Sequence, residues 1–504
     1  MARFGFVGPS YQSQSVIADA ERCFNWYVET IESQNGKSQL ALYPTPGLSI
    51  FATTARPVRG GIPINGRVFF VGGVSLWEVL ANGTANNLGN VGNDLQPVSM
   101  ATNGTAGNQV LICSAGALYV FNLATNTLTS VGALQGIPSM IEFCNAYFIA
   151  VLANSNKFQV SNLEDGTQWN PLGVQQVEDF SENIGSVKQA FNQLFLLGQN
   201  GRSAVYYDSG ANAYTPFDVV PGAVMEEGVD APWSTVVVDN TVFWIGANKN
   251  GNGIGWRANG YTPLRISNFA VETAWATYPK KSSDAIGYGY RDQGHTFWQL
   301  RFPSANGGFG ATWVYDVATN MWHERGFWSQ QGPTGYSAHL STCHVSAFGQ
   351  HLVGDWNSGN IYAMSIYTYQ DNGSAIRRFR RAPHISSEQQ RIFHSQMQLD
   401  MDVGDGPIPP LLDGAGNPRD PQVMLRWSDD GGSTWGNEHW VGAGQAGNYK
   451  TRVIWNRLGM SRDRVYEVAV TDPIPWRIVE AYLKATPGFQ VPTERLNKQM
   501  AKIT

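Results

Sequence analysis

At 504 residues, the chain is long enough to form more than one hydrophobic core. Glycine (55 residues) and proline (25 residues) are abundant, aromatic residues make up 12 % and charged residues only 14 %. This composition favours short strands joined by tight turns, and it excludes a helical bundle and a disordered chain. The formal net charge of −5 excludes a bulk attraction to nucleic acid or to an anionic membrane.

Cysteine usage and apolar runs indicate the compartment. The four cysteines, Cys23, Cys113, Cys144 and Cys343, lie far apart and form no CxxC pair. Cys113 and Cys144 sit inside apolar strand patterns, so we expect buried free thiols and a reducing compartment at synthesis. No run reaches the roughly 18 apolar residues of a membrane span, and no signal peptide is recognisable. The sequence therefore predicts a soluble protein that is made in a cytoplasm.

Residues 1–55 do not fit the repeat that follows them, and they are predicted to form an N-terminal arm. Residues 8–15 are polar and extended, and residues 19–31 are predicted to form a short helix. Pro44 and Pro46 exclude a helix around them. Because an isolated arm cannot bury its aromatic side chains, these should contact the rest of the chain or a neighbouring subunit. The aromatic residues in question are Tyr11, Phe24, Trp26 and Tyr27.

A short unit recurs along residues 56–385. Its clearest copies, 117–132 and 311–326, share a strand pattern, the turn Ala-Thr-Asn and a final glycine, which together predict a β-hairpin. One aromatic anchor marks each copy: Trp77, Tyr119, Phe158, Tyr206, Trp256, Trp313 and Tyr362. The anchors recur every 39–57 residues, a spacing typical of propeller blades.

A further strand pair precedes each anchor. In the first copy, residues 60–64 turn at Asn65-Gly66 into a second strand at 67–71. The later second strands are expected at 109–113, 146–150, 193–197, 241–245, 295–300 and 350–353. Each copy is therefore predicted to be a four-stranded blade, and the fold class is all-β, with a β-propeller of about seven blades over residues 56–385.

A second β domain is predicted after the propeller. Apolar and polar residues alternate at 395–402, 422–427 and 464–470, and a further strand is expected at 476–484. Several short strands without helices predict a small β-sandwich over residues 386–490. Residues 491–504 are predicted to be a polar tail.

One motif invites a catalytic interpretation. Ser428, Asp430, Gly432, Thr434 and Trp435 match the Asp-box pattern of sialidases and other propellers. In physical terms the motif is a hairpin turn, in which Asp430 accepts backbone hydrogen bonds, Gly432 takes an unusual φ and Trp435 packs into the core. A sialidase would need several boxes and an arginine cluster, whereas one box is present here and lies outside the repeats. We therefore predict a structural turn.

Other candidate catalytic groups are incomplete. The acidic pairs Glu226-Glu227 and Asp429-Asp430 are adjacent residues of expected loops, whereas glycosidic acid–base chemistry needs two carboxyl groups that flank a sugar. The eight histidines show no zinc spacing, and no phosphate loop or nucleophile elbow is present. We predict that the protein is not an enzyme and has no cofactor or metal.

The densest charge in the chain is the arginine segment at the end of the propeller. It contains Arg377, Arg378, Arg380 and Arg381, with Phe379 between them. The alternation and the following Pro383 predict an extended loop. Arginine forks suit phosphate or carboxylate groups, so the loop is expected either to line a DNA channel or to bind an acidic neighbour, with a solvated linker as the alternative.

Three places in the sequence resemble a known family. They are the N-terminal strings 8–15, 23–27 and 43–47, the segment Arg377–Arg381, and the segment Arg462–Pro473. In these places the chain resembles the packaged-DNA-stabilisation proteins of short-tailed bacteriophages, which are also called tail hub, nozzle or tail accessory proteins. Together the three places span nearly the whole chain.

The resemblance implies a structural virion protein that forms a homo-oligomeric ring, a hexamer, below the portal and adaptor proteins of the tail. Tail fibre, spike or needle proteins would lie around or below the ring. The ring would seal packaged DNA and form the channel for its ejection, without sequence-specific binding. The protein would be made in the host cytoplasm and located in the virion tail, with the N-terminal aromatic residues and the arginine segment at its contacts.

Two alternatives stay open. The first is a glycan-active or glycan-binding propeller, such as a depolymerase or a receptor-binding protein, which would need a pocket of converging acids and aromatic residues. The second is a propeller that serves as a scaffold for cellular complexes.

Overall fold

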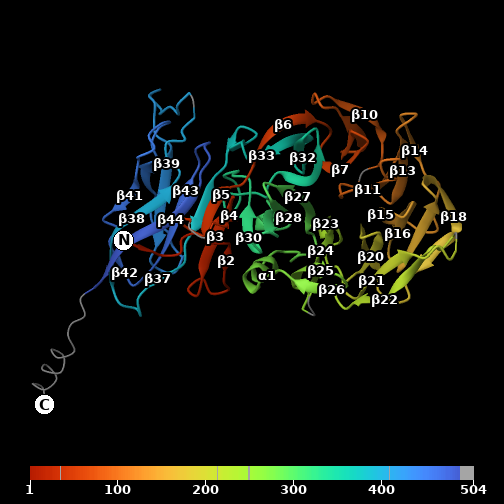
Figure 1. Cartoon of the computed structure of the whole chain (residues 1–504), viewed down its shortest axis with the longest axis horizontal. Helices are drawn as coiled ribbons and strands as arrows, with labels where there is room; N and C mark the ends of the chain where they lie inside the picture. Colours follow the sequence, from red (N-terminus) through yellow and green to blue (C-terminus); the bar gives the residue numbers. More distant parts are fainter. Residues whose placement is uncertain (34–35, 93, 213, 248–249, 408, 489–504) are drawn as a thin grey trace, which may run out of the picture. The chain divides into compact units, whose positions relative to one another are not determined.

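The computed structural model describes residues 1–33, 36–92, 94–212, 214–247, 250–407 and 409–488. The chain forms two compact units: Pro46–Ile376 is one, and Met1–Thr45 with Arg377–Thr504 is the other. Nearly all regular structure is strand, with one α-helix, α1 (Phe269–Ala276), in the described ranges (Figure 1). No helix among these residues is long and apolar enough to span a membrane. The all-β fold class is confirmed.

The first unit is a propeller with six blades of four consecutive antiparallel strands. The blades are β7–β10 (Val58–Ile64, Arg67–Gly72, Ser75–Val79, Ala85–Asn90), β11–β14 (Ser99–Thr102, Gln109–Ser114, Ala117–Asn122, Thr127–Ser130), β15–β18 (Pro138–Cys144, Tyr147–Leu152, Lys157–Asn162, Asp165–Gln176), β19–β22 (Ile184–Ala190, Gln193–Gly198, Ser203–Asp208, Phe217–Met225), β23–β26 (Val236–Val238, Thr241–Ala247, Gly253–Asn259, Thr262–Arg265) and β27–β30 (Ile286–Asp292, His295–Phe302, Ala311–Asp316, Met321–Arg325).

The hairpin prediction is confirmed at the level of single strands. Every aromatic anchor lies in the third strand of its group, from Trp77 in β9 to Tyr362 in β33 (Asn360–Ser365). The second strands begin within one residue of their predicted positions. These strands are nearly continuous apolar runs because both faces of a blade pack against neighbouring blades. Phe69, Val110 and Ile112, for example, share one buried cluster between the first two blades.

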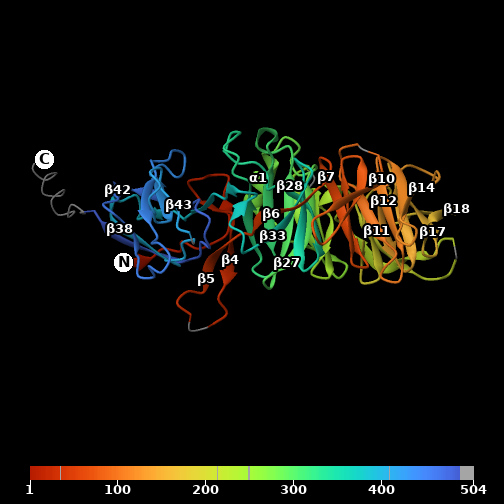
Figure 2. The same ribbon diagram turned by 90° about the horizontal axis from the view of Figure 1, so that it is seen from above.

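The last repeat differs from the prediction. β31–β33 (Ser341–Ala347, Gln350–Asp355, Asn360–Ser365) are consecutive, but the strand beside β33 is β6 (Gly47–Thr53), which precedes the first blade (Figure 2). β6 runs antiparallel to β33, from Asn360 opposite Thr53 to Ser365 opposite Gly47. Six blades, rather than the predicted seven, are therefore built from four consecutive strands, and the last repeat supplies only three strands to a sheet that β6 completes. The last repeat has no outer strand of its own because β6 occupies that edge.

The ring closes between its first and last groups. The first strands of successive groups contact one another in chain order, and β31 packs against β7. Val58, Val345, Leu352 and Ile361 form a buried cluster at this junction. Backbone pairing through β6 and side-chain packing through this cluster thus join the two ends of the propeller.

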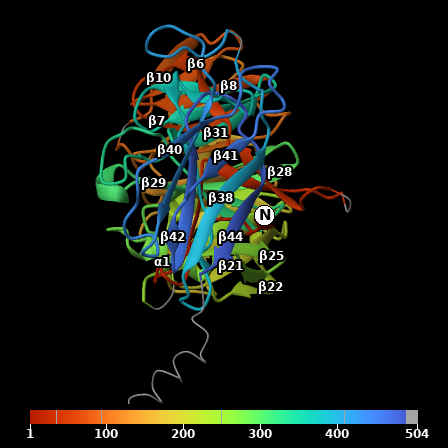
Figure 3. The same ribbon diagram turned by 90° about the vertical axis from the view of Figure 1, so that its left-hand side faces the viewer.

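The second unit is a β-sandwich, as predicted. One sheet has the order β4–β5–β44–β38–β41, and its partners β44 and β38 run side by side (Figure 3). The other contains β3–β36–β43–β39–β40. The strands are β3 (Ala20–Phe24), β4 (Trp26–Thr30), β5 (Leu40–Pro44), β36 (Arg378–Arg381), β38 (Ile392–Met401), β39 (Gln422–Ser428), β40 (His439–Gly442), β41 (Val453–Asn456), β43 (Asp463–Val470) and β44 (Ile478–Pro487).

Short strands extend both sheets. β1 (Ala2–Arg3) pairs with β44 and β42 (Met460–Ser461) with β38 in the first sheet. β2 (Tyr11–Gln12) pairs with β3 and β37 (Ile385–Ser386) with β43 in the second. In the propeller, β34 (Gln370–Asp371) pairs with β6 and with β35 (Ser374–Ala375).

The N-terminal predictions need correction. The described part of residues 1–55 contains no separate arm, because its strands belong to the sandwich and to β6 of the propeller. The predicted helix at 19–31 is wrong: β3 and β4 occupy this stretch and are separated by Asn25, whose φ is +57°. Asparagine tolerates this left-handed conformation, and pairing with distant strands outweighs local helix propensity. The predicted tail, 491–504, lies outside the described residues.

The closing junction leads to a stability prediction. Ile361 of β33 is fully buried, whereas Ile50 of β6 is 54 % exposed. Replacing Ile361 with alanine should lower the free energy of unfolding of the propeller by about 2–5 kcal/mol, because it leaves a cavity at the junction. Ile50→Ala, the matched control, should change it by no more than about 0.5 kcal/mol. Denaturant unfolding followed by tryptophan fluorescence measures both, and equal effects would contradict the packing described here.

Candidate functional site

The arginine segment is a strand in the middle of a sheet. β36 lies between β3 and β43, so its residues are covered on both edges. Arg378 and Arg380 are fully buried and Arg381 is 9 % exposed. Arg377, just before the strand, is half-buried and bonds Glu438 at 2.5 Å. The expected extended backbone is present, but the segment is neither a loop nor a solvated linker.

Arg380 is held by the N-terminal string. Its Nε donates to the Phe6 carbonyl at 2.7 Å, its Nη1 donates to the Pro9 carbonyl at 2.7 Å, and its Nη2 pairs with the Glu21 carboxylate. Burial raises the pKa of Glu21, against the opposing attraction of the Arg380 guanidinium. A Cβ at Gly8 would lie 2.8 Å from Nη2, so only glycine allows this close approach. The first two residues of the polar string 8–15, Gly8 and Pro9, therefore lie against the buried guanidinium group of Arg380.

Arg381 belongs to a second charged cluster, around Glu467 of β43. Glu467 is 1 % exposed, and it accepts hydrogen bonds from Arg381 at 2.9 Å and from Arg426 Nε at 2.7 Å. The two guanidinium groups lie 4.4 and 5.0 Å from the ring centroid of Trp435. Burial lowers the pKa of Arg381, while Glu467 acts against this shift. One carboxylate thus serves two arginines that are stacked on one indole ring.

A third pair completes this charged interior. Arg464 binds Asp429 through two hydrogen bonds, Nε to Oδ1 at 2.6 Å and Nη2 to Oδ2 at 2.8 Å. Its guanidinium carbon lies 5.1 Å from the Trp427 ring centroid. Asp429 is therefore engaged by arginine and does not form a catalytic pair with Asp430. Glu467 and Glu21 were not predicted as partners, since nothing in local spacing connects them to residues 380 and 381.

Most of the predicted contact aromatics are also buried. Phe24 stacks on Phe379 with centroids 5.0 Å apart, and the Trp26 indole donates to the Trp476 carbonyl at 2.9 Å. Tyr27 is 5 % exposed. Tyr11 is 37 % exposed, so it is the member of this set that presents its side chain to solvent. Phe24, Trp26 and Tyr27 are therefore covered within the chain itself, whereas Tyr11 is not.

The Asp-box forms the predicted turn. Asp430 accepts hydrogen bonds from the Ser433 and Thr434 amides at 3.0 and 2.9 Å, and from the Ser428 and Thr434 hydroxyls at 2.6 Å each. These donors, the Ser428 hydroxyl first, hold the pKa of Asp430 well below its usual value. Gly432 has a φ of +99°. Trp435 is half-buried against the two arginines and does not lie in the core.

The remaining groups considered from the sequence are Glu226, the possible metal ligands and the cysteines. Glu226 bonds Arg202 at 3.0 Å on the surface. Among the described residues, no group of three or more His, Cys, Asp and Glu side chains could hold a metal. The cysteines are free, as predicted, and burial raises the pKa of Cys113, Cys144 and Cys343 to about 12.

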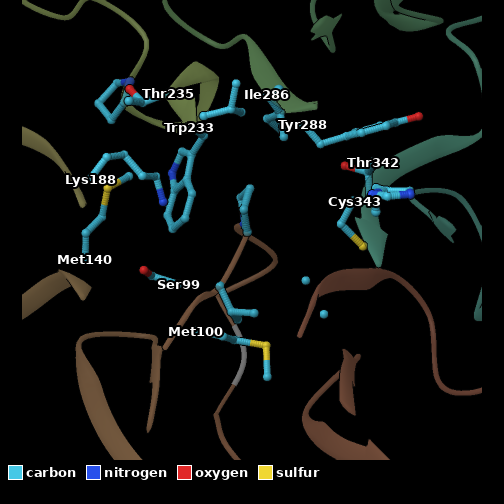
Figure 4. A pocket seen from close by; sticks show the side chains of 18 of the residues that line it. Ser99, Met100, Met140, Lys188, Trp233, Thr235, Ile286, Tyr288, Thr342 and Cys343 are labelled. Atoms are coloured by element: carbon cyan, nitrogen blue, oxygen red, sulfur yellow. The ribbon is translucent and has the colours of Figure 1, made fainter. Parts of the chain in front are cut away.

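The propeller encloses a channel between its first strands. One cavity of about 460 Å³ is bordered by Lys188 and Trp233 on one side and by Tyr288 and Cys343 on the other (Figure 4). A second cavity, of about 420 Å³, shares Arg59, Pro97, Trp233, Ile286 and Thr342 with the first. Sequence patterns did not reveal this channel, because its wall is assembled from short segments of every repeat.

Comparison with known proteins identifies the family. A family model described as the beta-propeller of bacteriophage P22 Gp10 matches residues 24–369, and one described as its beta-sandwich matches residues 377–486. The chain belongs to the P22 Gp10 family. This family comprises the DNA-stabilisation tail proteins of podoviruses, so the resemblance noted from the sequence is confirmed. The Gp10-like sandwich match begins at residue 377, where the second compact unit resumes.

Other comparisons add nothing to the Gp10 assignment. No curated protein sequence is detectably similar to the chain. A streptogramin B lyase structure has 9 % identity and a TM-score of 0.39, and the match covers 64 % of this chain and 98 % of the lyase. A virginiamycin B lyase from Staphylococcus aureus has 10 % identity and a TM-score of 0.37, with 68 % and 99 % covered. Structural similarity at these TM-scores supports no conclusion about the function of this chain. Membership of the Gp10 family makes the chain a structural phage tail protein.

The buried charge cluster gives a second prediction. Glu467→Gln should lower the free energy of unfolding of the sandwich by about 3 kcal/mol, because it leaves Arg381 and Arg426 without a counter-charge in a buried position. Glu226→Gln removes an exposed ion pair and should cost no more than about 1 kcal/mol. Thermal unfolding monitored by circular dichroism compares the two variants. A stable Glu467→Gln protein would show that the cluster does not hold the sandwich together.

Proposed function

We propose that this protein forms an oligomeric ring in a short phage tail, a hub or nozzle below the portal and adaptor, which seals packaged DNA and gives it passage during ejection. The observation that carries the proposal is the match of both Gp10 family models, in order, over residues 24–369 and 377–486. The net charge of −5 supports it, since a lumen that gripped phosphates tightly would oppose the movement of DNA.

The buried arginines influence how contacts with neighbouring subunits are proposed. Arg378, Arg380 and Arg381 stabilise the sandwich internally, so replacing them would disturb folding and assembly together. Exposed aromatic residues on the sandwich are better candidates, since such residues anchor protein interfaces. Tyr11 is 37 % exposed and Trp440, on the outer strand β40, is 57 % exposed. We place subunit or adaptor contacts at these two residues.

The assembly proposal is tested with surface variants. Tyr11→Ala and Trp440→Ala should leave the unfolding temperature unchanged, since both side chains are exposed, but should reduce assembly onto portal–adaptor complexes by roughly tenfold or more, as loss of an interface anchor does. Phe191→Ala, which removes a 66 % exposed aromatic residue of the propeller, serves as the control. Sedimentation of mixed components gives the readout.

Phage particles provide the test of the proposed sealing role. Particles that lack the protein should fill with DNA and then release it, and the two contact variants should lose infectivity in proportion to their assembly defect. Retention of DNA and infectivity by particles without the protein would refute the sealing role. Normal assembly of both variants would refute the contact surface alone.

We also expect no glycoside hydrolase activity. Glu226 is bonded to Arg202 on the surface and Asp430 is saturated with hydrogen-bond donors, so neither carboxylate is arranged to act on a sugar. Incubation of the purified protein with host polysaccharide should release no reducing sugar. Release that is abolished by Glu226→Gln or Asp430→Asn would contradict this expectation.

A further inference from the structure

One end of the propeller channel carries charged groups that the tail function does not require. The cavity of about 420 Å³ there is bordered by Arg301, Lys280 and Asp284 together with Trp233 and Trp356. Its volume falls in the range of roughly 300–1,000 Å³ that is usual for small-molecule sites. All of these residues belong to the propeller unit.

Arg301, near the end of β28, has one buried nitrogen without a hydrogen-bond partner among the described residues. Its guanidinium carbon lies 5.1 Å from the Trp356 ring centroid, and the buried nitrogen is Nε. Burial lowers the pKa of Arg301 to about 10, although Asp284 and Asp355 act against this shift. A buried donor without an acceptor is costly, typically about 1–3 kcal/mol and more for a charged group. The cation thus stacks on Trp356 and borders the cavity.

Asp284 has a buried acceptor atom without a hydrogen-bond donor among the described residues. Its Oδ2 accepts from the Ser304 amide at 2.8 Å, whereas its buried Oδ1 has no partner within the described ranges. Asp284 and Arg301 line the same cavity. A ligand between them would therefore need one acceptor for Arg301 and one donor for Asp284.

The cavity wall also contains apolar residues, which favour a ligand with an apolar face. Trp233 projects into the channel, and Pro57, Pro97 and Ile286 border the same space (Figure 4 shows Trp233 and Ile286). Indole rings commonly pack against the apolar face of a flat or ring-shaped ligand. Lys280, which is exposed at the cavity, adds a second cation. A ligand that suits this wall has an anionic group, hydroxyl donors and an apolar face.

We propose that this end of the channel binds an acidic sugar. The sugar carboxylate would accept from the Arg301 guanidinium, with Lys280 nearby, a hydroxyl would donate to the Asp284 carboxylate, and the apolar face of the ring would lie on Trp233. A phosphate group fits less well, because the Asp284 carboxylate would repel its higher charge. The site is independent of the proposed sealing role, and it would let a tail protein recognise a surface polysaccharide without cleaving it.

Calorimetric titration of the purified full-length chain tests the site, with D-glucuronate, D-glucose and inorganic phosphate as probes. We expect D-glucuronate to bind with a Kd on the order of 1 mM, an affinity within reach of two charged contacts. Arg301→Gln and Lys280→Gln should each weaken it, Arg301→Gln by roughly tenfold or more. Asp284→Asn should also weaken it, because an amide oxygen replaces a charged acceptor. Arg202→Gln, which removes a surface arginine elsewhere in the propeller, should leave it unchanged.

The Lys280→Gln variant keeps the test valid if the Arg301→Gln variant does not fold. Lys280 is exposed, so its replacement still reports on binding in that case. Absence of D-glucuronate binding, equal binding of D-glucose, tighter binding of phosphate, or affinities unchanged in Lys280→Gln and Asp284→Asn would each overturn the proposal. None of these outcomes affects DNA retention, which is measured on particles, so failure of this site and failure of the tail function are distinguishable.

Discussion

The pairing between β6 and β33 is the interaction on which the propeller depends. A ring of separate sheets is held mainly by side-chain packing, and its weakest point is the junction where the chain enters and leaves. Here a strand from before the first blade completes the last sheet, so backbone hydrogen bonds span that junction. The packing of β31 against β7 adds side-chain contacts at the same junction. The channel and its lining residues owe their fixed geometry to this closure.

The sandwich relies on a different principle. Its interior contains guanidinium groups that are matched one by one to carboxylates, carbonyls and aromatic rings: Arg380 to the N-terminal string, Arg381 and Arg426 to Glu467, and Arg464 to Asp429. Such pairs contribute little net stability compared with apolar packing, but each requires its own partner. We interpret them as a means of specifying register. The strand β36 cannot slip without exposing a buried charge to the wrong neighbour.

Local patterns in the sequence predict much of this fold, and distant pairings account for what they miss. Hairpins anchored at residues such as Tyr119 and Trp313 were predictable because both strands and the turn lie within about twenty residues. β6 was not, since its partner β33 lies some 300 residues later. The same reason explains the wrong helix at 19–31, where pairing with β36 and β5 decides the outcome. The arginine segment drew attention by its charge, but charge alone does not reveal that Glu21 and Glu467 enclose it.

The sandwich is formed from both ends of the chain, with the whole propeller between them. During synthesis, the strands from Met1 to Thr45 therefore leave the ribosome long before their partners from Arg377 onward exist. At roughly 5–20 residues per second, the intervening stretch of about 330 residues takes on the order of 20–60 seconds to translate. Throughout this interval Trp26 and Phe24 have no core to enter. The nascent chain thus presents an aromatic segment whose partner strands have not yet been synthesised.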